Sequence, residues 1–352
     1  MNLDDHQSFN DLDPQNMLGH IEALPGQLLK AWELGKQLPL PQFKEVKQVL
    51  IAGMGGSAIG GDLLANYVKS TCPIPVISHR DYSLPHWARG SETFVICSSH
   101  SGNTEETLSA FDEAVNNGCQ VLTLSTGGKL AKKAKAAGIT AWIFEHDGQP
   151  RTAIGYSFGM LLALLTRLGY FANVESAVAS AVAAMKAQQE SLSPQVGVTS
   201  NPAKRLAGQF LGRYVSVFAA GVLEPVARRW KTQINEIAKA WAQFEVLPEA
   251  DHNTLAGLLN PEELLTKVAA VFLKAELDHP RNKLRLNFTQ QAFMLEGFYT
   301  DEVTASGDTP LAQLWTLLHL GDYISYYLAM MYQVDPTPVE ALAELKEKLK
   351  DI

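Results

Sequence analysis

Short apolar runs alternate with longer amphipathic stretches along most of this 352-residue chain, and no other feature constrains the fold as much. In the first half, apolar runs occupy residues 48–51, 74–78, 93–98, 120–125 and 140–145. In the second half, similar runs occupy residues 212–222, 243–247, 267–273 and 301–305. Strands separated by helices at this spacing form parallel sheets with helices on both faces. The sequence therefore predicts an α/β fold.

The two halves resemble each other. "EVKQVLIAGMG" and "GRYVSVFAAGV" are both apolar strands that end in a turn of small residues. A chain of this length also exceeds one ordinary hydrophobic core, so two similar subdomains are expected. The predicted parts are an N-terminal helical segment at 1–40, a first subdomain at 41–172, a helical connector at 173–205, a second subdomain at 206–335 and a tail helix at 336–352.

Several helices can be placed within this plan. Asp13 and Pro14 are typical of a helix start, with Asp13 as the N-cap, and predict helices from 14 to 38. The most apolar segment, Ala153–Phe171, carries Arg167 and is barely long enough to cross a bilayer, so a buried helix is the better prediction. The acidic, polar N-terminus does not resemble a signal peptide.

Charge and cysteine content exclude several classes of protein. The chain carries 37 acidic and 29 basic residues, for a net charge of -8, and has no dense Lys/Arg cluster, which argues against a nucleic-acid partner. Cys72, Cys97 and Cys119 are too scattered for a disulfide framework or a zinc site, and Cys97 is expected in the core. The histidines show no zinc-binding spacing. We expect a cytoplasmic protein without a metal or a membrane partner.

A glycine-rich stretch, "LIAGMGGSAIGGDLL", follows the first predicted strand. A strand that runs through glycines into a helix can present backbone N–H groups to an anion. Gly53, Gly55 and Ala58 also fit a dinucleotide fingerprint, with Arg80 and Asp81 where a ribose-reading residue would lie. A tight turn without a ligand is the third interpretation.

A second polar loop, "SSHSGNTEETLSAFDEA", follows the third predicted strand. Ser99, Ser101 and Thr104 crowd a turn, and a helix is expected to begin near Thr104, which could cap the helix and also bind a ligand. Hydroxyl groups at a helix N-terminus favour a phosphate, and strands one and three can flank the crevice of an open α/β sheet. The two loops together favour a phosphomonoester over a dinucleotide, with Ser57 as a further ligand. The alternative for the second loop is an ordinary Ser/Thr N-cap.

These motifs carry a family resemblance. "SSHSGNTEET" resembles the signature of the sugar isomerase (SIS) domain, and "GMGGSAIGGDLL" followed by "RDYSLP" resembles the bifunctional phosphoglucose/phosphomannose isomerases of archaea and bacteria. The likeness extends from "LDPQNM" to "DPTPVEALAELK". It implies two flavodoxin-like SIS subdomains and a homodimer with shared active sites. It also implies metal-independent, cofactor-free interconversion of glucose 6-phosphate or mannose 6-phosphate with fructose 6-phosphate through a cis-enediolate.

The resemblance also implies roles for individual residues. The substrate phosphate would bind at Gly56, Ser57, Ser99, Ser101 and Thr104. Isomerisation further needs a base between C1 and C2, a cation at the enediolate oxygens and a group that opens the sugar ring.

Glu236 is the candidate base. Its predicted helix has an apolar stripe of Trp230, Ile234, Ile237 and Trp241, and Glu236 lies beside that stripe, where its carboxylate can be partly desolvated. The residues alone indicate only a solvated helix glutamate. The resemblance, through the glutamate of "INEIAK", makes it the base.

Three further residues receive roles from the resemblance. Arg151 would place its guanidinium at the enediolate oxygens, and His252 would open the ring from the neighbouring subunit. Lys346 matches a lysine that the family's tail returns to the site. A surface arginine, a loop histidine without a role and a solvated lysine face are the respective alternatives.

Two other functions stay open at this point. One is an SIS-domain isomerase of another phosphosugar, and the other is a non-catalytic sugar-phosphate-binding regulator. A regulator has no need for Glu236, Arg151 and His252 together, so their joint presence favours an enzyme.

Overall fold

The computed structural model describes residues 2–349, which divide into two compact units. The β1–β5 unit comprises Ala23–Lys186 and Ser306–Trp315, and the β6–β9 unit comprises the remaining described residues. The predicted subdomain boundaries stay predictions, and the last three residues of the predicted tail helix lie outside the described part.

The β1–β5 unit is built on a sheet of five parallel strands in the order β2-β1-β3-β4-β5. The strands are β1 (Gln48–Ala52), β2 (Val76–His79), β3 (Thr93–Ser98), β4 (Gln120–Ser125) and β5 (Ala141–Ile143). Strand β1 pairs with β2 on one side and with β3 on the other, so the strand order reverses between β1 and β3. Ligands of open α/β sheets bind at such a reversal.

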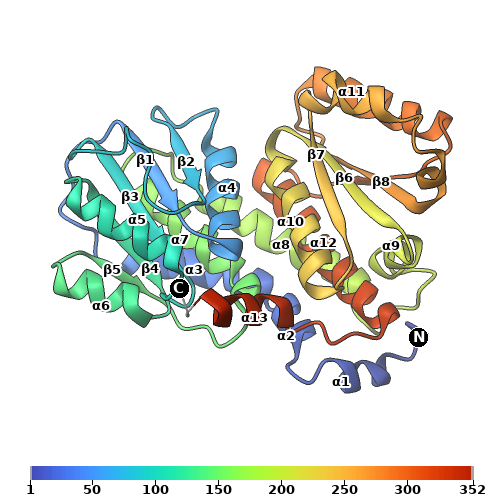
Figure 1. Cartoon of the computed structure of the whole chain (residues 1–352), viewed down its shortest axis with the longest axis horizontal. Coiled ribbons are helices and arrows are strands. Elements are labelled where there is room, and N and C mark those ends of the chain that lie inside the picture. The colour runs from blue at the N-terminus through green and yellow to red at the C-terminus, as the bar shows by residue number, and fades with distance from the viewer. Residues whose placement is uncertain (1, 350–352) are drawn as a thin grey trace. The chain divides into compact units, whose positions relative to one another are not determined.

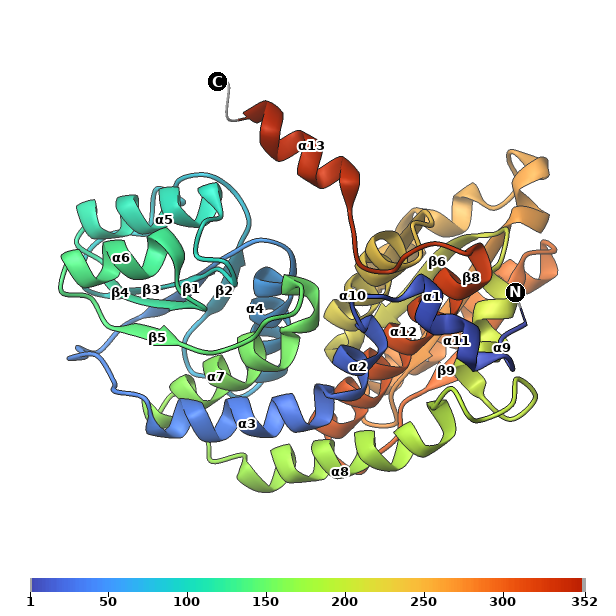
Figure 2. The same cartoon turned by 90° about the horizontal axis from the view of Figure 1, so that it is seen from below.

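Helices cover both faces of this sheet. Figure 2 shows α5 (Glu105–Asn116) and α6 (Gly128–Ala136) on one face, and α3 (Leu24–Gln37) and α7 (Ile154–Arg167) on the other. The unit also contains α4 (Gly55–Val68), the short helix η2 (Pro150–Thr152) and parts of α8 (Glu175–Leu192) and α12 (Pro310–Tyr332).

Helices α3 and α7 pack closely because glycines stand at their crossing. A Cβ on Gly35 would lie 2.7 Å from Cβ of Ala163, and one on Gly159 would lie 2.8 Å from Cβ of Ala31. Both distances are too short for real carbon contacts, so the glycines allow the two helices to approach.

The β6–β9 unit repeats the plan with four parallel strands in the order β7-β6-β8-β9. Its elements include β6 (Tyr214–Ala220), β7 (Ala242–Leu247), β8 (Val268–Lys274), β9 (Tyr299–Thr304), α9 (Pro202–Phe210), α10 (Glu224–Ile237) and α11 (Pro280–Leu295). Figure 1 shows α11 on one face of the sheet and α10 on the other. Phe218, Phe272 and Phe293 form part of the core under α11. The predicted α/β class with two parallel sheets is confirmed.

Short elements complete the β6–β9 unit. They are η1 (His6–Ser8), α1 (Phe9–Leu12), α2 (Met17–Glu22), η3 (Gly221–Leu223), η4 (Glu249–His252), η5 (Thr254–Gly257), η6 (Glu262–Lys267) and α13 (Glu340–Leu349). None of the helices among residues 2–349 is long and apolar enough to cross a lipid bilayer.

The predicted helix start at Pro14 is wrong. Helix α2 begins at Met17, because Asn16 adopts a left-handed conformation with φ 55°. Asp13 does accept hydrogen bonds from the first turn, from N–H of Met17 at 2.7 Å and of Leu18 at 2.9 Å. The carboxylate therefore caps the helix from a turn that precedes it.

Two further sequence expectations need correction. Helix α7 ends at Arg167 rather than at Phe171, since Gly169 takes a φ of 79°. Helix α10 ends at Ile237, and Lys239 takes a φ of 54°, so Trp241 lies beyond the helix. Trp241 is 71% exposed and packs edge to face on Tyr214, whereas the rest of the predicted stripe is buried.

Candidate active site

Two polar loops meet at the reversal in the β1–β5 unit. Helix α4 begins at Gly55, directly after β1, and α5 begins at Glu105, with Thr104 at its N-cap position. Because β1 and β3 are neighbours, both loops leave the same edge of the sheet. A hydrogen bond from the backbone N–H of His100 to Oγ of Ser57, at 3.3 Å, joins them.

Glycines allow the backbones at this edge to touch. A Cβ on Gly53 would lie 2.8 Å from the carbonyl oxygen of Ser98, and one on Gly56 would lie 2.6 Å from that of Pro150. The second contact brings η2, and with it Arg151, against the first turn of α4. The glycine-rich stretch thus allows the end of β3 and the η2 segment to approach the first turn of α4.

Three predicted phosphate ligands lie in the loop after β3. The hydroxyl groups of Ser99 and Thr104 are 2.9 Å apart. Ser101 is exposed, and its Oγ accepts from N–H of Asn103 at 3.2 Å. The prediction that Thr104 caps α5 through its side chain is wrong, because its hydroxyl turns to Ser99 instead. Gly102, with φ 64°, makes the turn between them.

Arg151 is 5% exposed, so its guanidinium lies inside the protein. Gln27 of α3 fixes the surrounding segment, since its Nε2 donates to the carbonyl oxygen of Thr152 at 2.9 Å and its Oε1 accepts from N–H of Gly155 at 2.7 Å. A permanently charged guanidinium held beside the start of α4 makes this edge of the sheet attractive to an anion.

Arg80, considered for a dinucleotide site, makes an ion pair with Asp62 of α4. Asp81 accepts from the backbone N–H of Tyr82 at 2.7 Å. Both side chains are thus engaged locally.

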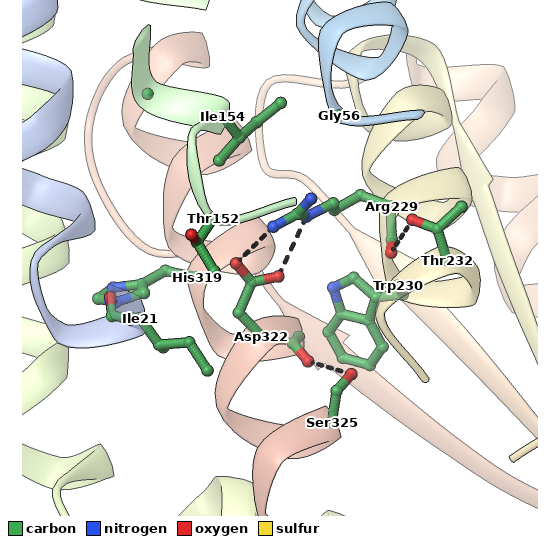
Figure 3. A network of polar contacts seen from close by, with 12 residues as sticks. Ile21, Gly56, Thr152, Ile154, Arg229, Trp230, Thr232, His319, Asp322 and Ser325 are labelled. Carbon is green, nitrogen blue, oxygen red and sulfur yellow. Dashed lines mark hydrogen bonds and ion pairs between the residues drawn. The ribbon is translucent and has the colours of Figure 1, made fainter. Parts of the chain in front are cut away.

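Glu236 lies in the β6–β9 unit, near the end of α10. Its side chain is half-buried, as expected for a residue beside an apolar stripe. Helix α10 is tied to α12 by Arg229, whose Nε and Nη2 bond the carboxylate of Asp322 at 3.1 and 2.9 Å (Figure 3). Trp230 adds a second link, since its Nε1 donates to the carbonyl oxygen of Leu317 at 2.8 Å. These buried bonds restrict rotation and sliding of the helix that carries Glu236.

His252 and Lys346 also belong to the β6–β9 unit. His252 is exposed at the end of η4. The preceding residue, Asp251, bonds Arg285 and Thr289 of α11, each at 2.7 Å, so α11 holds the short helix in place. Lys346 lies on α13, of which every described residue is exposed.

The structure therefore brings Gly56, Ser57, Ser99, Ser101, Thr104 and Arg151 together in one unit and places Glu236, His252 and Lys346 in the other. Within residues 2–349, no group of three or more His, Cys, Asp and Glu side chains is arranged to hold a metal ion.

Two features near these residues were not predicted from the sequence. His100 and His146 form a pair, although 46 positions separate them, and their sequence positions carry no signal of it. Gln233, three positions before Glu236, is 1% exposed, and neither amide atom has a hydrogen-bond partner among the described residues. An apolar stripe interrupted by a glutamine was the available signal for the second feature.

Comparison with known proteins assigns this chain to a family. The family model for the bacterial phospho-glucose isomerase C-terminal SIS domain matches residues 199–349. The bifunctional phosphoglucose/phosphomannose isomerase of Caldicellulosiruptor bescii is 39% identical over 340 residues, which cover 96% of this chain and 99% of that protein. This chain belongs to the bifunctional phosphoglucose/phosphomannose isomerase family. The Aquifex aeolicus protein of the same name is 34% identical over 305 residues, covering 86% of this chain and 91% of the relative.

Solved structures share the fold of this family member. A glucose-6-phosphate isomerase like protein from Thermus thermophilus matches with a TM-score of 0.64 and 20% identity, over 96% of this chain and 98% of that chain. The tagatose-6-phosphate ketose/aldose isomerase of Escherichia coli matches with a TM-score of 0.67 and 15% identity, over 92% and 95%. At these identities the likeness establishes the SIS fold alone.

Proposed function

We propose that this protein is an aldose–ketose isomerase that interconverts glucose 6-phosphate and mannose 6-phosphate with fructose 6-phosphate. The observation that carries the proposal is the joining of two hydroxyl-rich loops and a buried arginine at the strand-order reversal, in a chain 39% identical to a bifunctional phosphoglucose/phosphomannose isomerase. The loops supply hydroxyl donors for a phosphate, and the arginine supplies a cation.

The reaction moves a proton between C1 and C2 of the open-chain sugar. We assign Glu236 as the base that removes the proton from one carbon and returns it to the other. Arg151 would stabilise negative charge on the two enediolate oxygens, because its planar fork can donate two parallel hydrogen bonds. His252 would exchange a proton with the ring oxygen when the cyclic substrate opens, and Lys346 would add a second cation at the site.

We assign the substrate phosphate to the N-terminal ends of α4 and α5. The hydroxyl groups of Ser57, Ser99, Ser101 and Thr104 and the backbone at Gly56 would donate to its oxygens, and the two helix dipoles favour its negative charge. The Ser99–Thr104 bond supports this assignment, since it orients both hydroxyls before a ligand arrives.

A homodimer with shared sites is part of this proposal. The surface that we assign to the partner is not the one that hydrophobicity along the sequence would indicate. The two most apolar helical segments of the sequence, 153–171 and 313–332, would be the first candidates for a surface that a partner covers. They do not supply one, because α7 and the middle of α12 are buried within one chain. Exposed apolar side chains are instead found on α11 and on the segment between η5 and β8. They are Leu259, Leu264, Leu284, Phe288 and Leu295, with exposed fractions of 49–81%.

The apolar face formed by Leu284, Phe288 and Leu295 of α11 adjoins η4, which carries His252 and is bonded to α11. Large exposed apolar surface is typical of protein–protein contacts. We infer that a second copy covers it and that His252 enters the partner's site. The free cysteines Cys72, Cys97 and Cys119 are compatible with the cytoplasm, where we place the enzyme.

The test is a coupled assay of the purified protein with a panel of phosphosugars. Fructose 6-phosphate should form from both glucose 6-phosphate and mannose 6-phosphate, and the rate should be unchanged by EDTA. Glucosamine 6-phosphate belongs in the panel because a Sulfolobus acidocaldarius relative, 27% identical, is named D-glucosamine-6-phosphate 4-epimerase. Activity on that sugar alone would contradict the proposal, and loss of activity in EDTA that zinc restores would contradict the metal-free mechanism.

A further inference from the structure

Two histidines meet beside the loops of the β1–β5 unit. Nε2 of His100 lies 3.0 Å from Nδ1 of His146, and the rings meet edge to face with centroids 5.2 Å apart. His100 belongs to the loop after β3, and His146 belongs to the segment after β5 that leads into η2. The isomerisation chemistry above uses neither residue.

The backbone of His100 is part of the hydroxyl-rich loop. Its N–H donates to Oγ of Ser57 at 3.3 Å, and its carbonyl oxygen accepts from the hydroxyl and the N–H of Thr126 at 2.7 and 2.9 Å. Phe144 also packs against the His100 ring, with centroids 5.9 Å apart. A change in the position of His100 would therefore move the loop itself.

His146 is connected to Arg151 through the chain and through space. It precedes Arg151 by five positions, and its Nε2 lies 3.5 Å from Oγ1 of Thr152, the neighbour of Arg151. The Thr152 hydroxyl also donates to the carbonyl oxygen of Gln149 at 2.8 Å, which closes the η2 turn. Contacts thus run without a break from the loop after β3 to the segment that carries the arginine.

We propose that His100 and His146 are a positioning pair that holds the Arg151 segment at a set distance from the phosphate-binding loop. This inference rests on the proposed function. A substrate anchored by its phosphate at one point needs the cation at a matching distance to meet the C1 and C2 oxygens. The pair fixes that distance.

The pair has a defined proton requirement. A hydrogen bond between two ring nitrogens needs one N–H and one bare nitrogen, so it survives one added proton but not a second. Burial, with a smaller contribution from the charge of His146, lowers the pKa of His100 to about 4. Titratable groups around the pair are Glu145 and Asp147 beside His146, Arg151 on η2, Tyr156 on α7, and Lys30, whose ammonium lies over the Tyr156 ring.

Four single substitutions test the proposal. In His100→Gln, the side-chain amide can take the place of Nε2 of His100. In His146→Asn, the side-chain amide can take the place of Nδ1 of His146. Both variants therefore keep the hydrogen bond. His100→Leu and His146→Leu remove it. We expect each Leu variant to raise KM for glucose 6-phosphate and lower kcat, with kcat/KM down about five- to tenfold, the value of one such bond. The amide variants should stay within about twofold of wild type.

The pH dependence separates positioning from simple packing. As the pH falls below about 5, KM of the wild type should rise more steeply than KM of His100→Gln, because the side-chain amide of Gln does not take up a proton. Parallel pH profiles for the two proteins would overturn the proton requirement. Equal kcat/KM for the Leu and amide variants at pH 7.5 would overturn the positioning role.

The matched control is His79→Leu. His79, the last residue of β2, also makes a ring hydrogen bond at this edge of the sheet, through Nε2 and the carbonyl oxygen of Ser83 at 2.9 Å, and Ser83 lies outside the Arg151 segment. The kcat/KM of His79→Leu should not change. A loss equal to that of His100→Leu and His146→Leu would overturn the assignment.

A second readout does not depend on isomerase activity. Inorganic phosphate should raise the Tm of wild type, His100→Gln and His146→Asn, and should do so less at the same concentration for the two Leu variants. If the wild type binds phosphate in this way but isomerises no sugar, the proposed function fails while the pair is still tested. An equal Tm rise in all five proteins would overturn the link between the pair and the loop.

Discussion

Each of the two units buries a polar side chain near its candidate site residues. Gln233 is buried with neither amide atom bonded, and Arg151 is 5% exposed beside the start of α4. Burying such groups costs free energy that an apolar side chain would not, so their presence marks a place where stability is not the only requirement. Glu236 lies on the same helix as Gln233 and is only half-buried, which leaves its carboxylate accessible to a substrate.

Replacing Glu236 by Gln should abolish proton transfer while keeping the shape of the side chain. We expect kcat to fall by at least about a thousandfold, in the upper part of the range for a lost acid–base group, with little change in KM. The measurement is the exchange of deuterium from C2 of labelled glucose 6-phosphate into solvent. Exchange at the wild-type rate in Glu236→Gln would give the base role to another residue.

Among the elements, the loop after β3 and the first turn of α5 act together. The chain reverses at Gly102, where a Cβ would lie 1.9 Å from the carbonyl oxygen of Gly127, and Leu130 donates to the carbonyl oxygen of Gly102 at 2.8 Å. The beginning of α6 thus supports the loop from outside. A loop held in this way presents its hydroxyls without losing further conformational entropy on binding.

Removing two of these hydroxyls, in Ser101→Ala with Thr104→Ala, should weaken phosphate binding. Each hydrogen bond to a charged phosphate is worth about 1.5–3 kcal/mol, so KM should rise by about two orders of magnitude or more. Steady-state kinetics with glucose 6-phosphate measure this change, and circular dichroism checks that the fold is retained. An unchanged KM in a folded double variant would mean that the phosphate binds elsewhere.

The whole molecule repeats one α/β plan twice, yet the two units carry different residues of the proposed catalytic machinery. The β1–β5 unit contains the hydroxyl-rich loops and Arg151, and the β6–β9 unit contains Glu236, His252 and the apolar face of α11. The shared site that we propose, with His252 from a second copy, requires association as well as folding. Closed two-fold dimers are the commonest arrangement that meets this need.

Mixing two inactive variants tests the shared site. Glu236→Gln and His252→Ala are combined under conditions that exchange subunits. In a shared-site dimer, each heterodimer has one site with both residues intact, so up to about a quarter of the wild-type activity per site should return on random exchange. If both residues came from one chain, every site would lack one of them. No recovery, with exchange proven by mass spectrometry of tagged chains, would refute the shared site.

The sequence by itself determined the strands, the α/β class and the positions of the hydroxyl-rich loops. Each of these depends on local patterns: strands buried on both faces are continuous apolar runs, and helices begin after glycine- and hydroxyl-rich turns. Helix ends were less predictable, because single left-handed residues such as Asn16 and Lys239 end or delay a helix without a distinctive sequence signal.

Only the tertiary structure decided which side chains meet. His100 and His146 come together because β3, β4 and β5 are adjacent in one sheet, a consequence of strand order that no spacing along the chain encodes. The same holds for Arg229 and Asp322, which are joined by the packing of α10 on α12. It also holds for the burial of α7 and the exposure of apolar side chains on α11. Side-chain periodicity specifies the face that an element buries, whereas the element that covers this face depends on the packing of the whole chain.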